Sequence, residues 1–306
     1  MYDLTQCCKY NQIMKTIKPG DFNVEIQASL SEMPTDLGID ATKKEKEKAL
    51  KKLGKKLAKI QDRMYAHSRY GVLICLQGMD TSGKDSLVRE VFRSFNPRGV
   101  IVHSFKTPHS KELQHDYLWR HYIALPEKGK FAVFNRSHYE NVLVTRVNPH
   151  FLLNENMPGV ESVEEVPEDL WEKRYQQIIN FEKHITENGI ILFKFFLHLS
   201  KEEQRRRLLR RLEKEKHNWK FTPSDIAERA LWDQYQTHYE EAIKQTSTPF
   251  APWFIVPADN KQTARYIVAK VLLEEMEKYT DIREPDLDEA VRENLSKYVR
   301  KLKGED

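Results

Sequence analysis

The sequence predicts an α/β fold in which a parallel sheet is covered by helices on both faces. Apolar, partly β-branched runs alternate with helical segments through most of the chain. These runs are almost continuously apolar, which is typical of strands buried on both faces of a parallel sheet. With 306 residues, of which 40% are hydrophobic and 31% charged, the chain can bury a large core. No apolar run approaches the roughly 20 residues that a membrane span requires.

Five strands and a series of helices are expected, and no internal repeat or linker divides them. The strand-like runs are Val72–Gln77, Val100–Phe105, Phe131–Phe134, Ile190–Leu199 and Phe254–Pro257. The helical segments are a lysine-rich helix from the capping box Thr42-x-x-Glu45 to about Arg69, and segments near 84–95, 111–125, 170–187, 202–214, 223–245, 262–279 and 287–303. We therefore expect one domain over 1–306, composed of a packed arm and helix (1–70), a core (71–199), lid helices (200–246), and the last strand with C-terminal helices (247–306).

The order of strand, glycine loop and helix between Gly71 and Arg89 predicts a phosphate-binding loop. The sequence Gly78-x-x-x-x-Gly83-Lys84 follows the first apolar run and precedes a helical pattern, which argues against a chance glycine-rich turn. In such loops backbone N–H groups, a helix N-terminus and a lysine ammonium together attract the phosphate. Besides Lys84, the loop residues expected to bind phosphate are Gly78, Thr81, Ser82, Gly83, Asp85 and Ser86.

Two positions depart from the usual phosphate-loop pattern. Asp85 stands where a Ser or Thr hydroxyl normally holds Mg²⁺, so the metal needs another ligand, and Asp80 inside the loop is the candidate. The strand ending at Phe134 is followed by the neutral Asn135, where an Asp commonly assists Mg²⁺. Glu140 either restores a carboxylate to the site or is an ordinary acid in the first turn of a helix.

Charge is segregated along the chain, although the net charge is only +4. Lysines gather at residues 43–59, arginines at 205–211 and acids at 155–172. Local potential, more than net charge, steers a charged ligand. Caps at Ser200 and Thr222 begin two helices on either side of a short polar connection, which predicts a hinged lid over the phosphate loop.

The arginine run is either a solvated helix face or a phosphate-binding surface, and the scarcity of acids opposite it favours phosphate binding. Helical spacing divides the run into two neighbouring faces, Arg207 with Arg211 and Arg206 with Arg210. Lys220 extends this basic path toward the next helix.

Further basic side chains follow the second and third strands. Arg136 can contact the oxygens of a transferring phosphate through two parallel N–H groups. Lys106 and Arg120 are expected to meet an acceptor phosphate. Trp119 either packs in the core or stacks on a base, and the core role is favoured.

Several other sites are excluded. Cys75 falls in a buried strand, while Cys7 and Cys8 are adjacent without metal-ligand spacing, and the histidines form no zinc pattern. The segment after the last strand has Thr263 where guanine readout requires an Asp. The N-terminus lacks a secretory apolar region, so we expect a cytoplasmic protein.

Four blocks in this order resemble the polyphosphate kinase 2 family from about Leu53 to Met276. They are Gly78-Met-Asp80-x-x-Gly83-Lys84, Phe134-Asn-Arg136-Ser-His-Tyr-Glu140, Glu203-Gln-Arg-Arg206-Arg207 with Arg211, and Thr248-Pro-Phe-Ala-Pro-Trp-Phe-Ile-Val-Pro-Ala-Asp259. The resemblance implies a three-layer α/β/α P-loop kinase fold, thymidylate-kinase-like, with an arginine lid. Asn135, the nearby Glu140 and the extra segment Asn154–Glu168 resemble the subgroup that phosphorylates both AMP and ADP.

The resemblance also implies ligands and roles. It implies inorganic polyphosphate as donor, Mg²⁺ (or Mn²⁺) as cofactor, AMP, ADP and ATP as nucleotides, and self-association into a dimer or tetramer; neither nucleic acid nor membrane is expected as a partner. The implied roles are metal binding for Asp80, catalysis for Asp80, Lys84, Arg136 and Arg211, polyphosphate guidance for Arg206 and Arg207, and supporting roles in nucleotide binding for Lys106 and Arg120. From the residues themselves, Lys220 is expected to bind polyphosphate, Asn135 to lie against the nucleotide, and Glu140 to bind either the metal or the nucleotide.

The expected reaction is a reversible, Mg²⁺-dependent phosphoryl transfer from polyphosphate to AMP and ADP, which gives ADP and ATP. A terminal nucleotide phosphate is mostly ionised at neutral pH, so the acceptor needs no general base. Catalysis then depends on positioning and charge stabilisation. Two alternatives are an ATP-dependent nucleotide kinase and a non-catalytic polyanion-binding module. The second is disfavoured because aromatic residues do not interleave with the basic patches.

Overall fold

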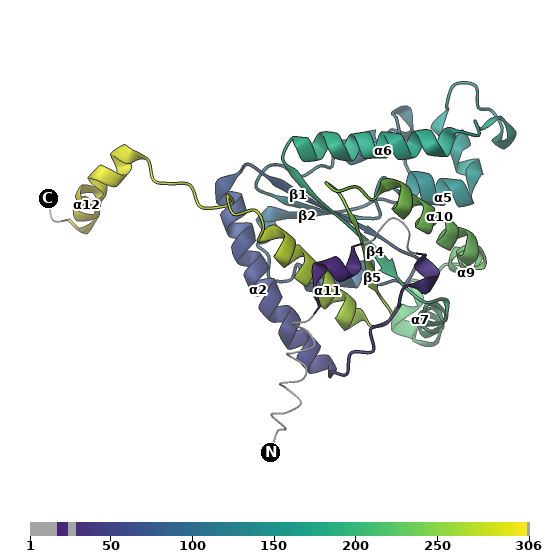
Figure 1. The fold of residues 1–306 in the computed structure, drawn as a ribbon, viewed down its shortest axis with the longest axis horizontal. Helices are drawn as coiled ribbons and strands as arrows, with labels where there is room; N and C mark the ends of the chain where they lie inside the picture. Colours follow the sequence, from purple (N-terminus) through teal and green to yellow (C-terminus); the bar gives the residue numbers. More distant parts are fainter. Residues whose placement is uncertain (1–16, 24–28, 305–306) are drawn as a thin grey trace, which may run out of the picture.

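One parallel sheet organises the chain (Figure 1). The structure, a computed structural model, describes residues 17–23 and 29–304. In these residues five strands pair in the order β2-β3-β1-β4-β5, and every pair is parallel. The strands are β1 (Gly71–Gln77), β2 (Val100–Ser104), β3 (Phe131–Asn135), β4 (Ile190–His198) and β5 (Trp253–Pro257). The expected α/β class and the five-stranded parallel sheet are therefore confirmed.

The strand register brings the predicted functional segments to one edge of the sheet. Leu76 near the end of the central strand β1 lies opposite Asn135 on β3 and Phe195 on β4. The glycine loop after β1 and the polar segment after β3 therefore start side by side. Ligands of parallel α/β sheets bind outside this carboxyl edge, where the strand order reverses around the central strand.

Helices cover both faces of the sheet (Figure 1). The α-helices are α2 (Lys43–His67), α3 (Lys84–Val91), α4 (Trp119–Tyr122), α5 (Glu140–Val147), α6 (Leu170–Glu187), α7 (Lys201–Glu213), α8 (Glu215–Asn218), α9 (Ser224–Ala230), α10 (Trp232–Thr246), α11 (Lys261–Met276) and α12 (Glu289–Lys303). Short 3₁₀ turns occur at η1 (Pro19–Phe22), η2 (Leu30–Glu32), η3 (Pro97–Gly99), η4 (Glu112–Gln114), η5 (Pro149–Glu155) and η6 (Val163–Glu165).

Two helices predicted as continuous are interrupted. The segment 111–125 contains only η4 and α4, because the Asp116 side chain accepts the Leu118 N–H and forms a turn between them. The segment 223–245 breaks at Leu231 into α9 and α10, with Trp232 buried directly after the break. Helix α5 was missing from the expected helices.

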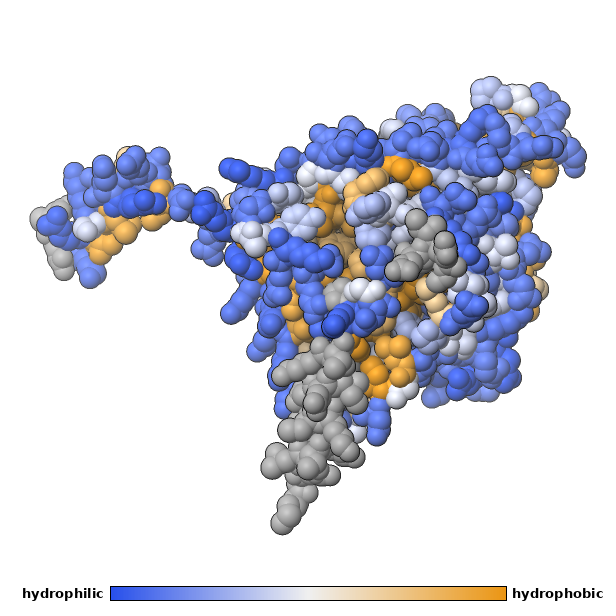
Figure 2. Space-filling view, in the orientation of Figure 1, coloured by the Kyte–Doolittle hydropathy of each residue, from blue (hydrophilic) through white to orange (hydrophobic). Residues whose placement is uncertain are grey.

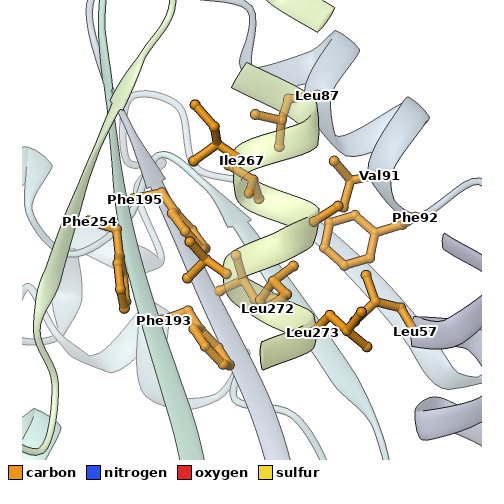
Figure 3. Close-up of a cluster of buried hydrophobic side chains, with 14 of the residues drawn as sticks. Leu57, Leu87, Val91, Phe92, Phe193, Phe195, Phe254, Ile267, Leu272 and Leu273 are labelled. Carbon is orange, nitrogen blue, oxygen red and sulfur yellow. The ribbon is translucent and has the colours of Figure 1, made fainter. Parts of the chain in front are cut away.

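Two apolar layers pack against the sheet. On one face, α2, α3 and α11 contribute Leu57, Leu87, Val91 and Ile267 to a cluster that contacts the sheet residue Phe195 (Figure 3). On the other face, α5, α6 and α10 pack in a layer rich in aromatic side chains, which includes Trp232 and Tyr239 of α10, Tyr139 just before α5, and Trp253 of β5, together with Ile178 of α6. Burial of each of these large side chains stabilises the fold by about 1.5–3 kcal/mol. Cys75 is fully buried in β1 as predicted, whereas Cys7 and Cys8 lie outside the described residues.

The two ends of the described chain differ in packing. The segment after η2 packs on the end of β5, because the Asp259 N–H donates to the Thr35 carbonyl and Asp259 Oδ2 accepts from Thr35 Oγ1. Helix α12 instead lies away from the body (Figure 1). It has no buried residue, and Leu295 and Tyr298 are among its exposed large side chains. Figure 2 shows hydrophobic surface along one side of this helix. Among the helices of the described residues, none is long and apolar enough to cross a bilayer.

Candidate active site

The glycine loop curls around the ammonium group of Lys84. Lys84 Nζ donates to the Gly78 carbonyl at 2.6 Å and lies 3.3 Å from the Met79 carbonyl and 3.4 Å from Ser82 Oγ. The backbone φ of Gly78 is +145°, a value that residues with a side chain rarely adopt, and a Cβ atom at this position would lie only 2.9 Å from the Leu197 carbonyl oxygen. The pKa of Lys84 is lowered to about 8, mainly by burial and next by the charge of Arg136, while Asp80 and other carboxylates oppose the shift. The loop thus holds a cation whose charge depends on pH near neutrality.

Arg136 joins the two carboxylates that were predicted to bind metal. Its guanidinium donates to Asp80 Oδ1 at 2.9 Å and to Glu140 Oε2 at 3.3 Å. The charge of Glu140 raises the pKa of Arg136; burial opposes this shift and Asp80 supports it, so the guanidinium stays charged. Arg136 itself has a φ of +65°, an unusual conformation for a residue with a side chain. The structure thus places Asp80, Arg136 and Glu140 together.

Asp85 and Asn135, the two residues that depart from the usual phosphate-loop pattern, are in contact. Asn135 Nδ2 donates to Asp85 Oδ1 at 2.6 Å, which connects the end of β3 to the first turn of α3. An Asp at position 135 would bring a second negative charge to the Asp85 carboxylate. Such close like charges are destabilising. The neutral amide at 135 is therefore the physical complement of the acid at 85, a pairing that neither deviation reveals alone.

Arg207 is bound on all sides by protein oxygens. Its Nε donates to Glu203 Oε1, one terminal nitrogen to the carbonyls of Thr81 and Ser82, and the other to those of Ala258 and Asp259, at distances of 2.8–3.1 Å. A guanidinium has five N–H donors, and five acceptors surround this one. The predicted contact of Arg207 with polyphosphate therefore requires that one of these bonds be broken.

A cavity of about 850 Å³ runs from the glycine loop to the lid helices. Arg211 lines it and forms an ion pair with Asp225 at 3.0 Å, and Lys220 lies further along. Arg206 does not line this cavity; its side chain is 62% exposed and pairs with Glu203. The cationic residues that line the cavity are Lys84, Arg89, Lys106, Arg136, Arg207, Arg210, Arg211, Lys220 and Lys261, against the acids Asp80, Asp85 and Asp225.

Two of these cations, Arg89 and Lys261, are absent from the predicted site residues, whereas Arg210 belongs to the arginine run expected to bind phosphate. Lys261 begins α11 shortly after β5, and its pKa is lowered to about 8, mainly by burial and next by Arg207 and Arg210. The sequence of the segment after β5 excludes guanine readout and predicts at most a loop that borders a nucleotide base. Its place after a strand that ends at the ligand-binding edge was the available signal.

A second cavity of about 120 Å³ adjoins the first and shares Lys106, Thr107 and Arg136 with it. Arg120 lines this smaller cavity, and its guanidinium donates to the Lys106 carbonyl at 2.8 Å and lies over the Phe105 ring. Glu140 lines it as well, while Trp119 lines neither cavity and stacks on His115. Apolar side chains close this cavity, among them Pro108, Leu113, Val144 and Phe151. The two cavities thus meet at Arg136.

Comparison with known proteins assigns the family. Residues 40–284 match the family model described as Polyphosphate kinase 2. The chain is 47% identical over 222 residues to "ADP-polyphosphate phosphotransferase" of Rhodopseudomonas palustris, covering 72% of this chain and 76% of the relative. It is 44% identical over 229 residues to "AMP/ADP-polyphosphate phosphotransferase" of Meiothermus ruber, covering 75% and 80%.

A solved structure supports both fold and family. The crystal structure of Polyphosphate Kinase 2 from Arthrobacter aurescens superposes with a TM-score of 0.81 at 33% identity, covering 92% of this chain and 96% of that one. The predicted P-loop kinase architecture and the family resemblance are both confirmed by these matches. The chain belongs to the polyphosphate kinase 2 family.

Proposed function

We propose that this protein transfers a phosphoryl group reversibly from inorganic polyphosphate to AMP and ADP, giving ADP and ATP. The observation that carries the proposal is the meeting of two unlike cavities at Arg136. The larger is lined mainly by cations and suits a polyanionic chain. The smaller, of about 120 Å³, combines apolar side chains with Lys106, Arg120 and Glu140 and suits one part of a nucleotide. The printed names of the two relatives agree with this pairing of substrates.

The residues at the junction act by positioning and by charge. Lys84 and Arg136 neutralise the group in transfer, and Arg211 approaches it from the lid. Arg207 donates hydrogen bonds to carbonyl groups of the glycine loop and so holds the loop in one conformation. Because the transition state is loose and the acceptor phosphate is already ionised, fixed cations carry most of the catalysis.

The carboxylates at this junction fit a magnesium ion. Asp80 Oδ1 is engaged by Arg136, whereas Asp80 Oδ2 makes no hydrogen bond within the described residues, and its side chain is 32% exposed. No group of three or more His, Cys, Asp or Glu residues in that part of the chain could cage a metal. This suits Mg²⁺, which uses one or two carboxylates together with substrate phosphates and water. Asp80, and Glu140 on the other side of Arg136, would hold the ion, which when bound neutralises phosphate charge.

The test is a direct assay on the full chain. The protein is incubated with AMP or ADP, polyphosphate of defined length and Mg²⁺, and nucleotides are separated by chromatography. We expect ADP and ATP from AMP, ATP from ADP, and no product when a chelator replaces the metal. ATP replaces polyphosphate in a parallel reaction; transfer from ATP alone would identify an ordinary nucleotide kinase. Salt-sensitive RNA binding without any transfer would identify a polyanion-binding module.

Three further properties remain predictions: a single domain over 1–306, a cytoplasmic location, and assembly into a dimer or tetramer. The last is tested by light scattering coupled to size-exclusion chromatography. A monomeric mass at micromolar concentration would contradict self-association.

A further inference from the structure

A cluster of buried polar side chains lies under the segment that carries Arg136 and Glu140. We call it the buried network and define it as His138, Tyr139, Glu182, Lys194 and Thr246. All five side chains are inaccessible to solvent. They come from the segment after β3, from α6, from β4 and from α10, so the network ties four elements together.

Lys194 is the centre of the network. Its Nζ donates to Glu182 Oε2 at 2.7 Å, to the Thr246 carbonyl at 2.7 Å and to Tyr139 Oη at 3.1 Å. These contacts use all three donors of the ammonium group. The other oxygen of Glu182 accepts from Tyr139 Oη at 2.7 Å and lies 3.2 Å from His138 Nε2. Lys194 lowers the pKa of Glu182 against the opposing effect of burial, while burial lowers the pKa of Lys194 against the opposing effect of Glu182.

The segment alternates between the cavity and this network. Arg136 and Glu140 line the smaller cavity, while the three residues between them, 137–139, are completely buried. Ser137 accepts from Gln77, the last residue of β1, at 3.1 Å, and His138 and Tyr139 face Glu182. The side chains of Arg136 and Glu140 therefore extend from a segment whose middle residues, 137–139, are held by hydrogen bonds in the protein interior.

The backbone conformation of Arg136 requires that the surrounding structure hold this segment in place. Its φ of +65° is one that an arginine does not adopt without constraint from its surroundings. Replacement of a buried ion pair by apolar residues of similar size is often neutral or stabilising, so stability alone is a weak reason for charges at 182 and 194.

We propose that Glu182 and Lys194 are positioning residues for phosphoryl transfer, which act through Tyr139 and His138 to hold Arg136 and Glu140 where the two cavities meet. The inference rests on the proposed function. None of the network side chains lines either cavity, so their loss removes no substrate contact directly. The predicted signature is a fall in kcat with little change in KM for polyphosphate, because most residues of the larger cavity lie outside the segment.

The first variant is Tyr139→Phe, which keeps the ring and the Glu182–Lys194 pair but removes the hydroxyl contacts to both and leaves only the contact of His138 with Glu182. We expect kcat to fall about tenfold or more, with KM for polyphosphate within about twofold of wild type. The matched control is Tyr175→Phe. Tyr175 is buried on α6, and its hydroxyl accepts from Arg146 instead of contacting the segment. We expect this control to keep kcat within about twofold.

A second variant tests the same role without leaving an unpaired buried charge that could prevent folding. Glu182→Leu combined with Lys194→Met removes both charges, so that neither is left buried and unpaired. We expect it to show a comparable fall in kcat at a temperature where circular dichroism shows a folded protein. If Tyr139→Phe and the double variant both keep kcat near that of Tyr175→Phe, or if KM for polyphosphate rises as much as kcat falls, the positioning role is wrong. Failure of the proposed function is a separate outcome, because the wild-type protein would then form no nucleotide product.

Discussion

The cations at the base of the large cavity and two cations on its lid helices are held in opposite ways. At the base, Lys84, Arg136 and Arg207, the last of which is carried by α7, donate to protein oxygens, including carbonyls of the glycine loop. Further along α7 and beyond it, Arg210 is exposed and makes no hydrogen bond or ion pair within the described residues, and Lys220 lies against the Trp219 ring. Arg211 on α7 is paired with Asp225 and belongs with the held cations.

This difference separates two physical tasks. Charge that stabilises a transition state must be in place before the reaction, because reorganisation during the reaction would cost free energy. Charge that gathers a flexible polyanion needs only to be numerous and accessible, and its effect is screened by salt. We therefore expect substitutions at the base to lower kcat, and substitutions on the lid to raise KM for polyphosphate.

The largest effect is expected at Lys84. Lys84→Ala removes the cation around which the loop is folded, and we expect kcat to fall at least about 100-fold, or roughly 3 kcal/mol of transition-state stabilisation. Steady-state rates of ADP formation from AMP measure this loss, and thermal unfolding shows whether the fold survives. Near-normal turnover in a folded variant would remove Lys84 from the mechanism.

A loss of similar size is expected at Arg207, although no substrate contact is needed to explain it. Arg207→Lys keeps the charge but cannot reach the carbonyls of Thr81, Ser82, Ala258 and Asp259 at once, so buried carbonyls lose partners. We expect a lower melting temperature and a fall in kcat of about 10–100-fold. The matched control is Arg206→Lys on the same helix, where both readouts should stay near wild type. Equal effects at 206 and 207 would contradict the division between base and lid.

The pH dependence tests the base of the cavity without a substitution. The pKa of Lys84 is lowered to about 8, mainly by burial, so this lysine is charged below that pH and loses its proton above it. In the free enzyme, kcat/KM should therefore be constant near pH 7 and fall about tenfold by pH 9. A value of kcat/KM that stays flat through pH 9.5 would show that the ammonium keeps its proton.

A smaller effect is expected at the contact between Asn135 and Asp85. Asn135→Asp places two carboxylates together, and we expect kcat to fall about fivefold. Adding Asp85→Asn should recover most of the loss, because the pair then again has one acid and one amide. A double-mutant cycle measures this coupling. Additive losses in the double variant would show that the contact at 2.6 Å carries no coupling.

The smallest change in kcat is expected on the lid. Arg210→Ala with Lys220→Ala should raise KM for polyphosphate several-fold at low salt, leave kcat within about twofold, and weaken the dependence of KM on ionic strength. Assays across a series of salt concentrations provide the measurement. A large fall in kcat instead would show that lid cations reach the reacting group.

The interrupted helices mark a boundary of sequence prediction. Apolar periodicity located α6 at its observed bounds and α7 to within a residue at each end, because each presents a regular stripe to the core. It did not show the break at Leu231 or the turn at Asp116, since both depend on single side chains that find partners or burial in the folded chain. Helix α5 is short and mostly buried, so it lacks the alternation of polar and apolar faces that signals a helix.

Within the site, short-range patterns located the segments but not the contacts. The strand, glycine loop and helix order placed Lys84 and Asp80 correctly beside each other, and helical spacing separated the inward Arg207 and Arg211 from the exposed Arg206. Which protein oxygens each guanidinium meets, and the role of Lys261, could not be read from spacing. These depend on β5 and α11 arriving next to the loop from far along the chain.

The linear order of apolar runs, glycines and charges was sufficient for the parallel sheet, the phosphate loop and the family resemblance, because each of these is a local or periodic property of the chain. The folded arrangement alone settled how five donors of Arg207 are occupied, why Asn135 suits Asp85, and how Lys194 and Glu182 meet beneath Tyr139. Hydrogen bonds and ion pairs require atoms within about 3 Å. Residues distant in sequence come that close only after the sheet has formed.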